Sequence, residues 1–67
     1  ETLLLQINQQ GTATVEVFDA VGKKIHQWVH TANGSIELPL SISQAGIYLV
    51  KVTDVDGKQR AARFTIR

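Results

Sequence analysis

The sequence predicts an all-β sandwich of antiparallel strands, and three observations carry that prediction. Apolar and polar residues alternate over short runs, which is the period of a half-buried strand. Turn-forming residues separate these runs at intervals of about ten residues. The chain has 67 residues, of which 43% are apolar and 19% charged, the balance of one small globular domain.

Two candidate strands lie before the first loop. Leu3, Leu5 and Ile7 share one face of the first strand, and the polar run Gln9–Gly11 is expected to end it. The second strand alternates apolar and polar side chains over residues 12–17, and its β-branched residues suit a pleated, half-buried surface. The following loop contains Gly22 and turns the chain.

The middle of the chain predicts a third and a fourth strand. The third runs from about Lys24 to His30, and the fourth keeps a period of two over residues 36–42. Asn33-Gly34 between them is a strong hairpin signal and predicts a tight turn. Pro39 has no N–H for a sheet ladder, so the fourth strand is expected to be an edge strand or one that switches sheets.

A helix is the alternative for the third strand. Five apolar residues also fall at helical spacing: Val21, Ile25, Trp28, Val29 and Ala32. On a helix, His26 and His30 would lie one turn apart and could share a zinc ion, so a small metal-binding domain is one functional alternative. On a strand they would be roughly 13 Å apart, too far to bind one metal. The β-forming residues of this segment favour the strand.

The last two candidate strands form a hairpin. Tyr48, Val50 and Val52 share one face of the strand over residues 47–53, and Asp56-Gly57 is the expected apex of the turn after it. Asp54 and Asp56 resemble the start of a calcium-binding loop, but basic residues follow where further oxygen ligands are needed, so the pair is interpreted as turn chemistry.

Alternation also assigns the faces of the last strand, which spans residues 59–66. Three side chains are expected to point inward and three outward. These are Ala62, Phe64 and Ile66 on the inner face, and Arg63, Thr65 and Arg67 on the outer face.

The charge of the whole chain is nearly balanced. Seven Lys and Arg against six Asp and Glu give a net charge of +1, too weak to indicate nucleic acid or an anionic membrane as the partner. There is no cysteine, hence no disulfide framework and no thiolate metal site. The last ten residues nevertheless carry four cations and no anion: Lys58, Arg60, Arg63 and Arg67.

No residue pattern predicts catalysis. The serines lack a nucleophile-elbow motif, and the carboxylates are scattered singly, so we expect no catalytic site, no cofactor and no metal. Phe18, Trp28 and Tyr48 could form a sugar-stacking platform, but in so small a domain such aromatics more often pack in the core. Trp28, on the opposite strand face from Ile25 and Val29, is the aromatic expected to be at least partly exposed.

Three sequence blocks carry a family resemblance. Val15–Asp19 with Gly22–Ile25 is similar to V-x-I-Y-D-x-x-G-K-x-V, and Ala45–Val52 is similar to A-G-V-Y-L-V-K-I. The end of the chain, Asp56–Lys58 with Arg63–Arg67, is similar to an N-G-K turn and a terminal K-x-V-I-R/K. In this order the blocks resemble the type A C-terminal sorting domains of the type IX (Por) secretion system of Bacteroidetes. The motif residues with an implied structural role are Asp19, Gly22, Lys23, Gly46, Tyr48 and Gly57.

The chain departs from the family pattern at three points. Gln44 stands where the family usually has Pro, and Ile42 is displaced by one from the usual Leu. The opening Pro-Asn-Pro segment of the family is absent. We therefore expect residues 1–67 to be a single domain, a fragment that lacks a short N-terminal lead and the upstream cargo.

The resemblance implies a small Ig-like β-sandwich of about six to seven antiparallel strands that is not an enzyme. It implies a C-terminal signal that directs a larger cargo through the outer-membrane type IX translocon, by way of the periplasm, to the cell surface or the medium. The implied partners are type IX components, a surface sortase and the N-terminal cargo domain, without nucleic acid or membrane insertion.

The residues for translocon recognition stay a hypothesis. Recognition could use the backbone edge of the last strand and a cationic outer face made of Lys58, Arg60, Arg63 and Arg67, by strand addition or charge complementarity. The alternative function is an Ig-like accessory or spacer module of an extracellular enzyme, with carbohydrate binding through Trp28 as one form of it.

Overall fold

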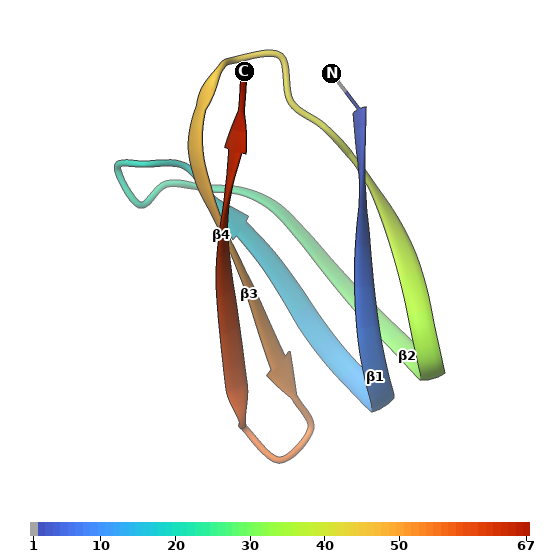
Figure 1. Ribbon diagram of the computed structural model, residues 1–67. Coiled ribbons are helices and arrows are strands. Elements are labelled where there is room, and N and C mark those ends of the chain that lie inside the picture. Colours follow the sequence, from blue (N-terminus) through green and yellow to red (C-terminus); the bar gives the residue numbers. More distant parts are fainter. Residues whose placement is uncertain (1) are drawn as a thin grey trace.

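The computed structural model describes residues 2–67, together with their side chains other than those of residues 2, 3 and 32. Its four strands are β1 (Thr2–Phe18), β2 (Lys24–Ser41), β3 (Gly46–Asp54) and β4 (Gln59–Ile66). They form one antiparallel sheet in the order β2-β1-β3-β4 (Figure 1). The all-β prediction is confirmed, and the helical alternative for the third strand is wrong because that segment lies in β2.

All six candidate segments form strands, but they make four continuous ones because two predicted turns do not interrupt the pairing. β1 contains the first two candidates and β2 contains the next two. In the middle of the β1–β2 ladder, Gln9 pairs with Gly34 and Gln10 pairs with Asn33. The strand end expected at Gln9–Gly11 and the hairpin expected at Asn33-Gly34 are therefore wrong.

The two glycines lie instead where the long β1–β2 ribbon folds over itself. Gly11 has a φ of 87° and Gly34 a φ of 118°, values that residues with a side chain rarely adopt. In Figure 1, β1 runs down from the N-terminus, reverses direction and runs back beside β3. The fold places the first half of β1 and the second half of β2 as one layer over the rest of the sheet.

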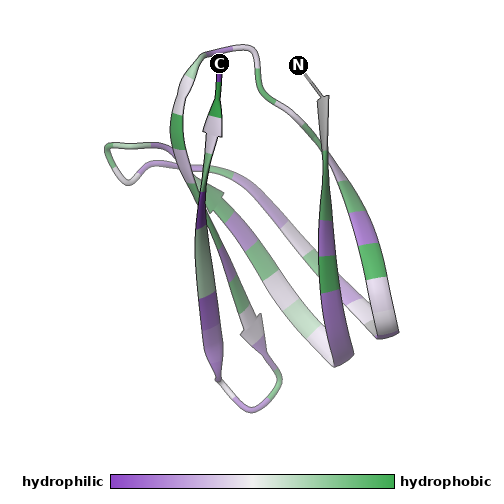
Figure 2. Ribbon diagram, viewed as in Figure 1, coloured by the Kyte–Doolittle hydropathy of each residue, from purple (hydrophilic) through white to green (hydrophobic). Residues whose placement is uncertain are grey.

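The hydrophobic core lies between these two layers. Leu38 and Leu40 of β2 pack against Val15 and Val17 of β1, and all four side chains are fully buried. Figure 2 shows the alternation of apolar and polar residues along both strands. Burying each such side chain stabilises the fold by about 1.5–3 kcal/mol. Leu5 is partly buried against the same core, while the side chain of Leu3 lies outside the described residues.

The strand order leaves two kinds of free backbone edge. β2 and β4 are the edge strands, so the expectation that Pro39 lies on an edge strand is confirmed. β3 pairs with β1 only from Ala13 to Phe18. Within the described part of the chain, residues 4–12 of β1 therefore pair only with β2. The sandwich is open on the side where these residues face β4.

The described residues contain no helix that is long and apolar enough to cross a membrane.

Candidate recognition surface

The four C-terminal cations do not share one face: Arg60 and Arg63 lie in β4, Lys58 precedes the strand and Arg67 follows it. Arg60 lies opposite Val52, which is buried in the core, whereas Arg63 lies opposite Leu49, which is exposed on the other face. Because side chains alternate along a strand, Arg60 belongs to the inner face and Arg63 to the outer face. The expectation that Arg60 shares a cationic outer face with the others is therefore wrong.

The remaining face assignments for β4 agree with the pairing. Ile66 is buried and Phe64 packs against the core, and Arg63 and Thr65 lie outside. Ala62 is on the inner face opposite Val50 yet remains exposed, because it lines an open groove. The inner face of β4 is thus covered by the core near Ile66 and exposed to solvent from Arg60 to Ala62.

The four cations have no ion-pair partner among the described residues. The two ion pairs there are Lys24 Nζ to Glu16 Oε2 at 3.6 Å and Lys51 Nζ to Glu16 Oε1 at 3.7 Å. Both are on β1–β2–β3 and involve none of the four C-terminal cations, whose side chains are all exposed. Arg60, Arg63 and Arg67 therefore present positive charge along β4 and just after it, whereas Lys58 shares its turn with Asp54 and Asp56.

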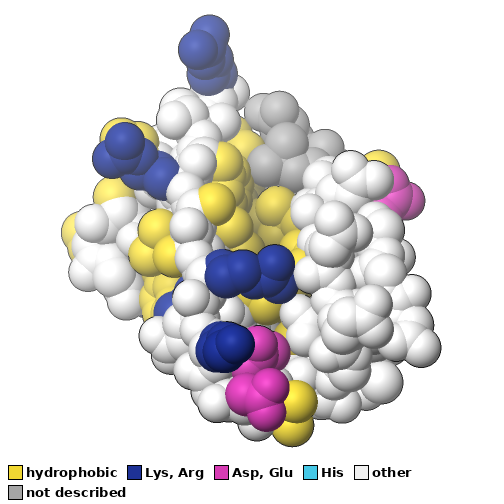
Figure 3. Space-filling view, turned by 60° about the horizontal axis from the view of Figure 1, so that its bottom comes forward, with side chains coloured by type: hydrophobic (Ala, Val, Ile, Leu, Met, Phe, Trp, Pro, Cys, Tyr) yellow, Lys and Arg dark blue, Asp and Glu magenta, His cyan; other side chains and the backbone are white. Residues whose placement is uncertain are grey.

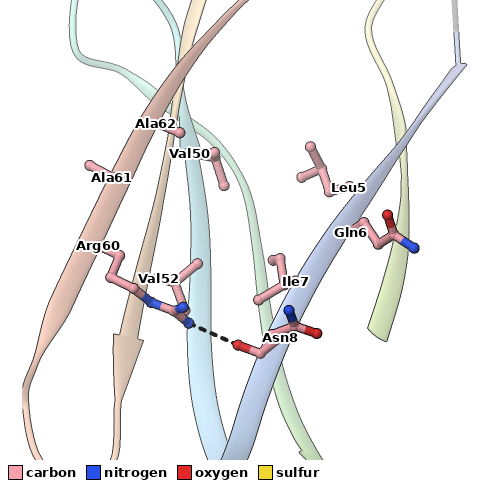
Figure 4. Close-up of a pocket in the computed structure, with 9 residues that line it drawn as sticks. All are labelled: Leu5, Gln6, Ile7, Asn8, Val50, Val52, Arg60, Ala61 and Ala62. Atoms are coloured by element: carbon pink, nitrogen blue, oxygen red, sulfur yellow. Dashed lines mark hydrogen bonds between the residues drawn. The ribbon is translucent and has the colours of Figure 1, made fainter. Parts of the chain in front are cut away.

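A groove lies on the open side of the sandwich, between the first half of β1 and β4. Its volume is about 340 Å³. Its apolar floor is formed by Leu5 and Ile7 of β1 and by Val50 and Val52 of β3. The backbone of β1 forms one wall and residues 60–62 of β4 form the other (Figure 4). Figure 3 shows this hollow with apolar side chains at the bottom and with Lys and Arg side chains across it and along one side.

Arg60 crosses the groove and joins its two walls. Its Nη2 donates a hydrogen bond to the backbone carbonyl of Asn8 at 3.1 Å (Figure 4) and another to Gln9 Oε1 at 3.2 Å. Gln9 is only 5% exposed, and its amide Nε2 donates to the carbonyl of Gln10 at 3.2 Å. The partners of Arg60 in the described part of the chain are therefore neutral acceptors.

The outer face of β3 and β4 carries an apolar patch beside Arg63. Ile47 and Leu49 are 50% and 39% exposed, and Phe18 pairs with Leu49 across the sheet. The ammonium of Lys51 lies 5.6 Å from the centre of the Phe18 ring. Exposed apolar side chains next to a cation are typical of protein contact surfaces, where arginine and aromatic residues are enriched.

The family-motif residues have structural roles. Asp19, Gly22 and Lys23 form the turn between β1 and β2, and Gly57 lies in the turn between β3 and β4. Gly46 begins β3, and a Cβ there would lie 3.8 Å from the Tyr48 ring.

Tyr48 is buried in the core, and its hydroxyl donates a hydrogen bond of 2.7 Å to the carbonyl of Gln44. A tyrosine bonded to the backbone a few residues upstream is a hallmark of Ig-like sandwiches. The acceptor is a backbone carbonyl, so glutamine serves as well here as the proline that the family usually has.

Trp28 and the two histidines belong to the packing of β2. Trp28 pairs with Val15, packs against the core and is partly exposed, as expected, while Val29 on the outer face is 63% exposed. Ile25 packs against the same core as Trp28, so the expectation that these two lie on opposite faces is wrong; the β1–β2 register shifts between Val17 and Phe18, and the alternation does not continue through Ile25. The His26 ring stacks on Trp28 with centroids 4.8 Å apart and an interplanar angle of 7°. Because β2 is a strand, His26 and His30 do not share the helical turn that joint zinc binding required. The described residues contain no group of three or more His, Cys, Asp and Glu side chains that could hold a metal.

Comparison with known proteins gives one positive finding. The model of the family "Secretion system C-terminal sorting domain" matches the chain over residues 1–67. A search of curated proteins gives no match. The family match covers every block on which the resemblance to type IX sorting domains rests. This chain belongs to the secretion system C-terminal sorting domains, and its resemblance to the type IX members is confirmed.

Proposed function

We propose that the outer-membrane type IX translocon recognises this domain through β4 and thereby exports the cargo joined to it. The family supplies the coarser statement: the chain is a C-terminal secretion signal for a cargo protein, acts with the type IX machinery, and leads to export through the outer membrane. The family is in general non-catalytic. The finer steps, which are recognition through β4 and the route after it, are proposed here.

The observation that supports β4 is its position at the edge of the sheet. It pairs with β3 on one side only, so the backbone groups along its other side are available to an added strand. Arg63 lies on its outer face next to the apolar patch of Ile47 and Leu49, and Arg67 follows its end. A receptor could thus combine backbone hydrogen bonds, apolar contact and charge complementarity.

The proposed route continues beyond recognition. The single domain of residues 1–67 follows the cargo in the chain and passes through the periplasm with it. A surface sortase then removes the domain, and the cargo is attached at the cell surface or released. This route is supported by the family resemblance.

A secretion assay with paired variants tests the role of β4. A fluorescent cargo with its own inner-membrane signal is fused to residues 1–67 and expressed in a host with a working type IX system. The double substitution Arg63→Gln and Arg67→Gln is expected to lower cargo export several-fold, because two exposed cations of the proposed surface are lost.

The matched control changes the net charge equally at β2. Asn33→Asp and Gln27→Glu are close to isosteric, lie at exposed positions of the opposite edge strand and also lower the net charge by two units, by adding two carboxylates. Export of the control at the parent level, with reduced export of the β4 variant, supports the proposal. Equal export of both variants and the parent contradicts recognition through the outer cations of β4.

A further inference from the structure

We propose that the groove between the first half of β1 and β4 binds an extended peptide segment that carries a carboxylate. The peptide adds as a strand to the free edge of β1, and its carboxylate pairs with Arg60. This inference does not depend on the proposed sorting function, because it concerns the inner face of β4 and a different free edge.

The backbone of β1 has unused hydrogen-bonding groups that point into the groove. The carbonyl of Asn8 accepts a bond from Arg60, so it faces β4 and not β2. In a strand the N–H and C=O of one residue point to the same edge, and the edge alternates from residue to residue. Leu4 and Gln6 therefore turn their backbone groups the same way as Asn8, toward a side without a strand partner among the described residues.

The floor of the groove is apolar and incompletely covered. Leu5 and Ile7 face inward and are only partly buried, and Ala62 on the inner face of β4 is exposed. An added strand beside β1 places every second side chain over this floor. Small or medium apolar side chains at those positions would cover Ala62 and the open sides of Leu5 and Ile7.

The charge of the groove selects a carboxylate. Among the described residues, Arg60 donates to two neutral oxygens, both through Nη2, although its guanidinium has five N–H donors. A carboxylate accepts two parallel bonds from a guanidinium and is a stronger partner than a neutral carbonyl. When Arg60 turns to a peptide carboxylate it releases the carbonyl of Asn8, which then accepts an N–H of the added strand. Pairing of the peptide carboxylate with Arg60 is thus coupled to pairing of the peptide backbone with β1.

The test is a binding measurement with two synthetic peptides and the 67-residue chain. The probe is a capped, fluorescently labelled peptide that alternates valine and threonine around one central glutamate, and the second peptide has glutamine at that place. Fluorescence anisotropy is expected to show about tenfold tighter binding of the glutamate peptide, since a charge-assisted hydrogen bond replaces a neutral one. Arg60→Gln should abolish this difference, whereas Arg63→Gln, the same change on the outer face of the same strand, should preserve it.

Amide chemical shifts locate the peptide and do not depend on any variant. Changes at Leu4, Gln6 and Asn8, but not along β2, are expected on addition of the glutamate peptide. The proposal is overturned by the absence of binding, by a glutamate preference that survives Arg60→Gln, or by shifts confined to another edge. Dimerisation of the free chain through these same three residues would assign the groove to a second copy and also overturn it. No translocon is present in the assay, so its outcome is separate from that of the secretion assay.

Discussion

Asp19 and Asp54 organise two separate turns with the same four hydrogen bonds. In each turn, one carboxylate oxygen accepts from the backbone N–H groups two and four residues later, at 3.1 and 2.9 Å for Asp19 and at 3.0 and 2.9 Å for Asp54. The backbone of each aspartate also accepts from the following glycine and donates to the following lysine. Both turns have the sequence D-x-x-G-K.

Replacing the organising carboxylate should therefore destabilise the fold. We expect Asp54→Ala to lower the free energy of unfolding by about 1–2 kcal/mol, because two backbone N–H groups lose their acceptor. Asp54→Asn keeps an oxygen at the same place and should retain most of the stability. Urea unfolding measures both. Asp56→Ala is the control within the same turn, with an expected change within about 0.5 kcal/mol; a cost equal to that of Asp54→Ala would contradict the assignment.

The hydrogen bond from Tyr48 to the Gln44 carbonyl gives a second prediction. Tyr48→Phe keeps the ring in the core and removes only the donor, so unfolding should become about 1 kcal/mol easier. Because the acceptor is a backbone carbonyl, the loss should be the same when Gln44→Pro is already present. A double-mutant cycle by chemical denaturation measures this additivity. A strong coupling between the two changes would show that the Gln44 side chain takes part in the contact.

The two-layer core predicts a sharp contrast between two leucines. Leu40 is fully buried between the layers, whereas Leu4 is 64% exposed. Leu40→Ala should destabilise the domain by about 2–5 kcal/mol through lost burial and a residual cavity. Leu4→Ala should change stability by less than about 0.5 kcal/mol. Thermal and urea unfolding of the two variants measure the contrast, and similar losses in both would contradict the observed packing.

The sequence predicted the strands better than their connections. Period-two alternation identified all six strand segments, because alternation follows directly from which face is buried. It did not show that Gly11 and Gly34 lie at bends and not at chain reversals. A glycine among polar residues gives the same local signal for a bend within a strand and for a tight turn between strands. Which of the two forms depends on long-range pairing, here of Gln9 with Gly34 and of Gln10 with Asn33.

The candidate surface was predictable in part. The cluster of C-terminal cations was visible in the sequence, and the position of Arg60 an even number of residues before Ala62, Phe64 and Ile66 already indicated the inner face. The groove was not predictable, because it depends on where β3 stops pairing with β1; among the described residues this leaves residues 4–12 with one free edge. The recurrence of D-x-x-G-K was the signal that could have identified Asp54, and not Asp56, as the organising residue of its turn.

The central claim is that these residues export a cargo through the type IX system, and a comparison of two hosts tests it most directly. A fluorescent protein with its own inner-membrane signal is fused to residues 1–67 and expressed in a type IX-competent host and in its translocon-deficient mutant. We predict fluorescence at the cell surface or in the medium only in the competent host. Retention of the fusion in the periplasm of both hosts would contradict the claim and would favour an accessory Ig-like module.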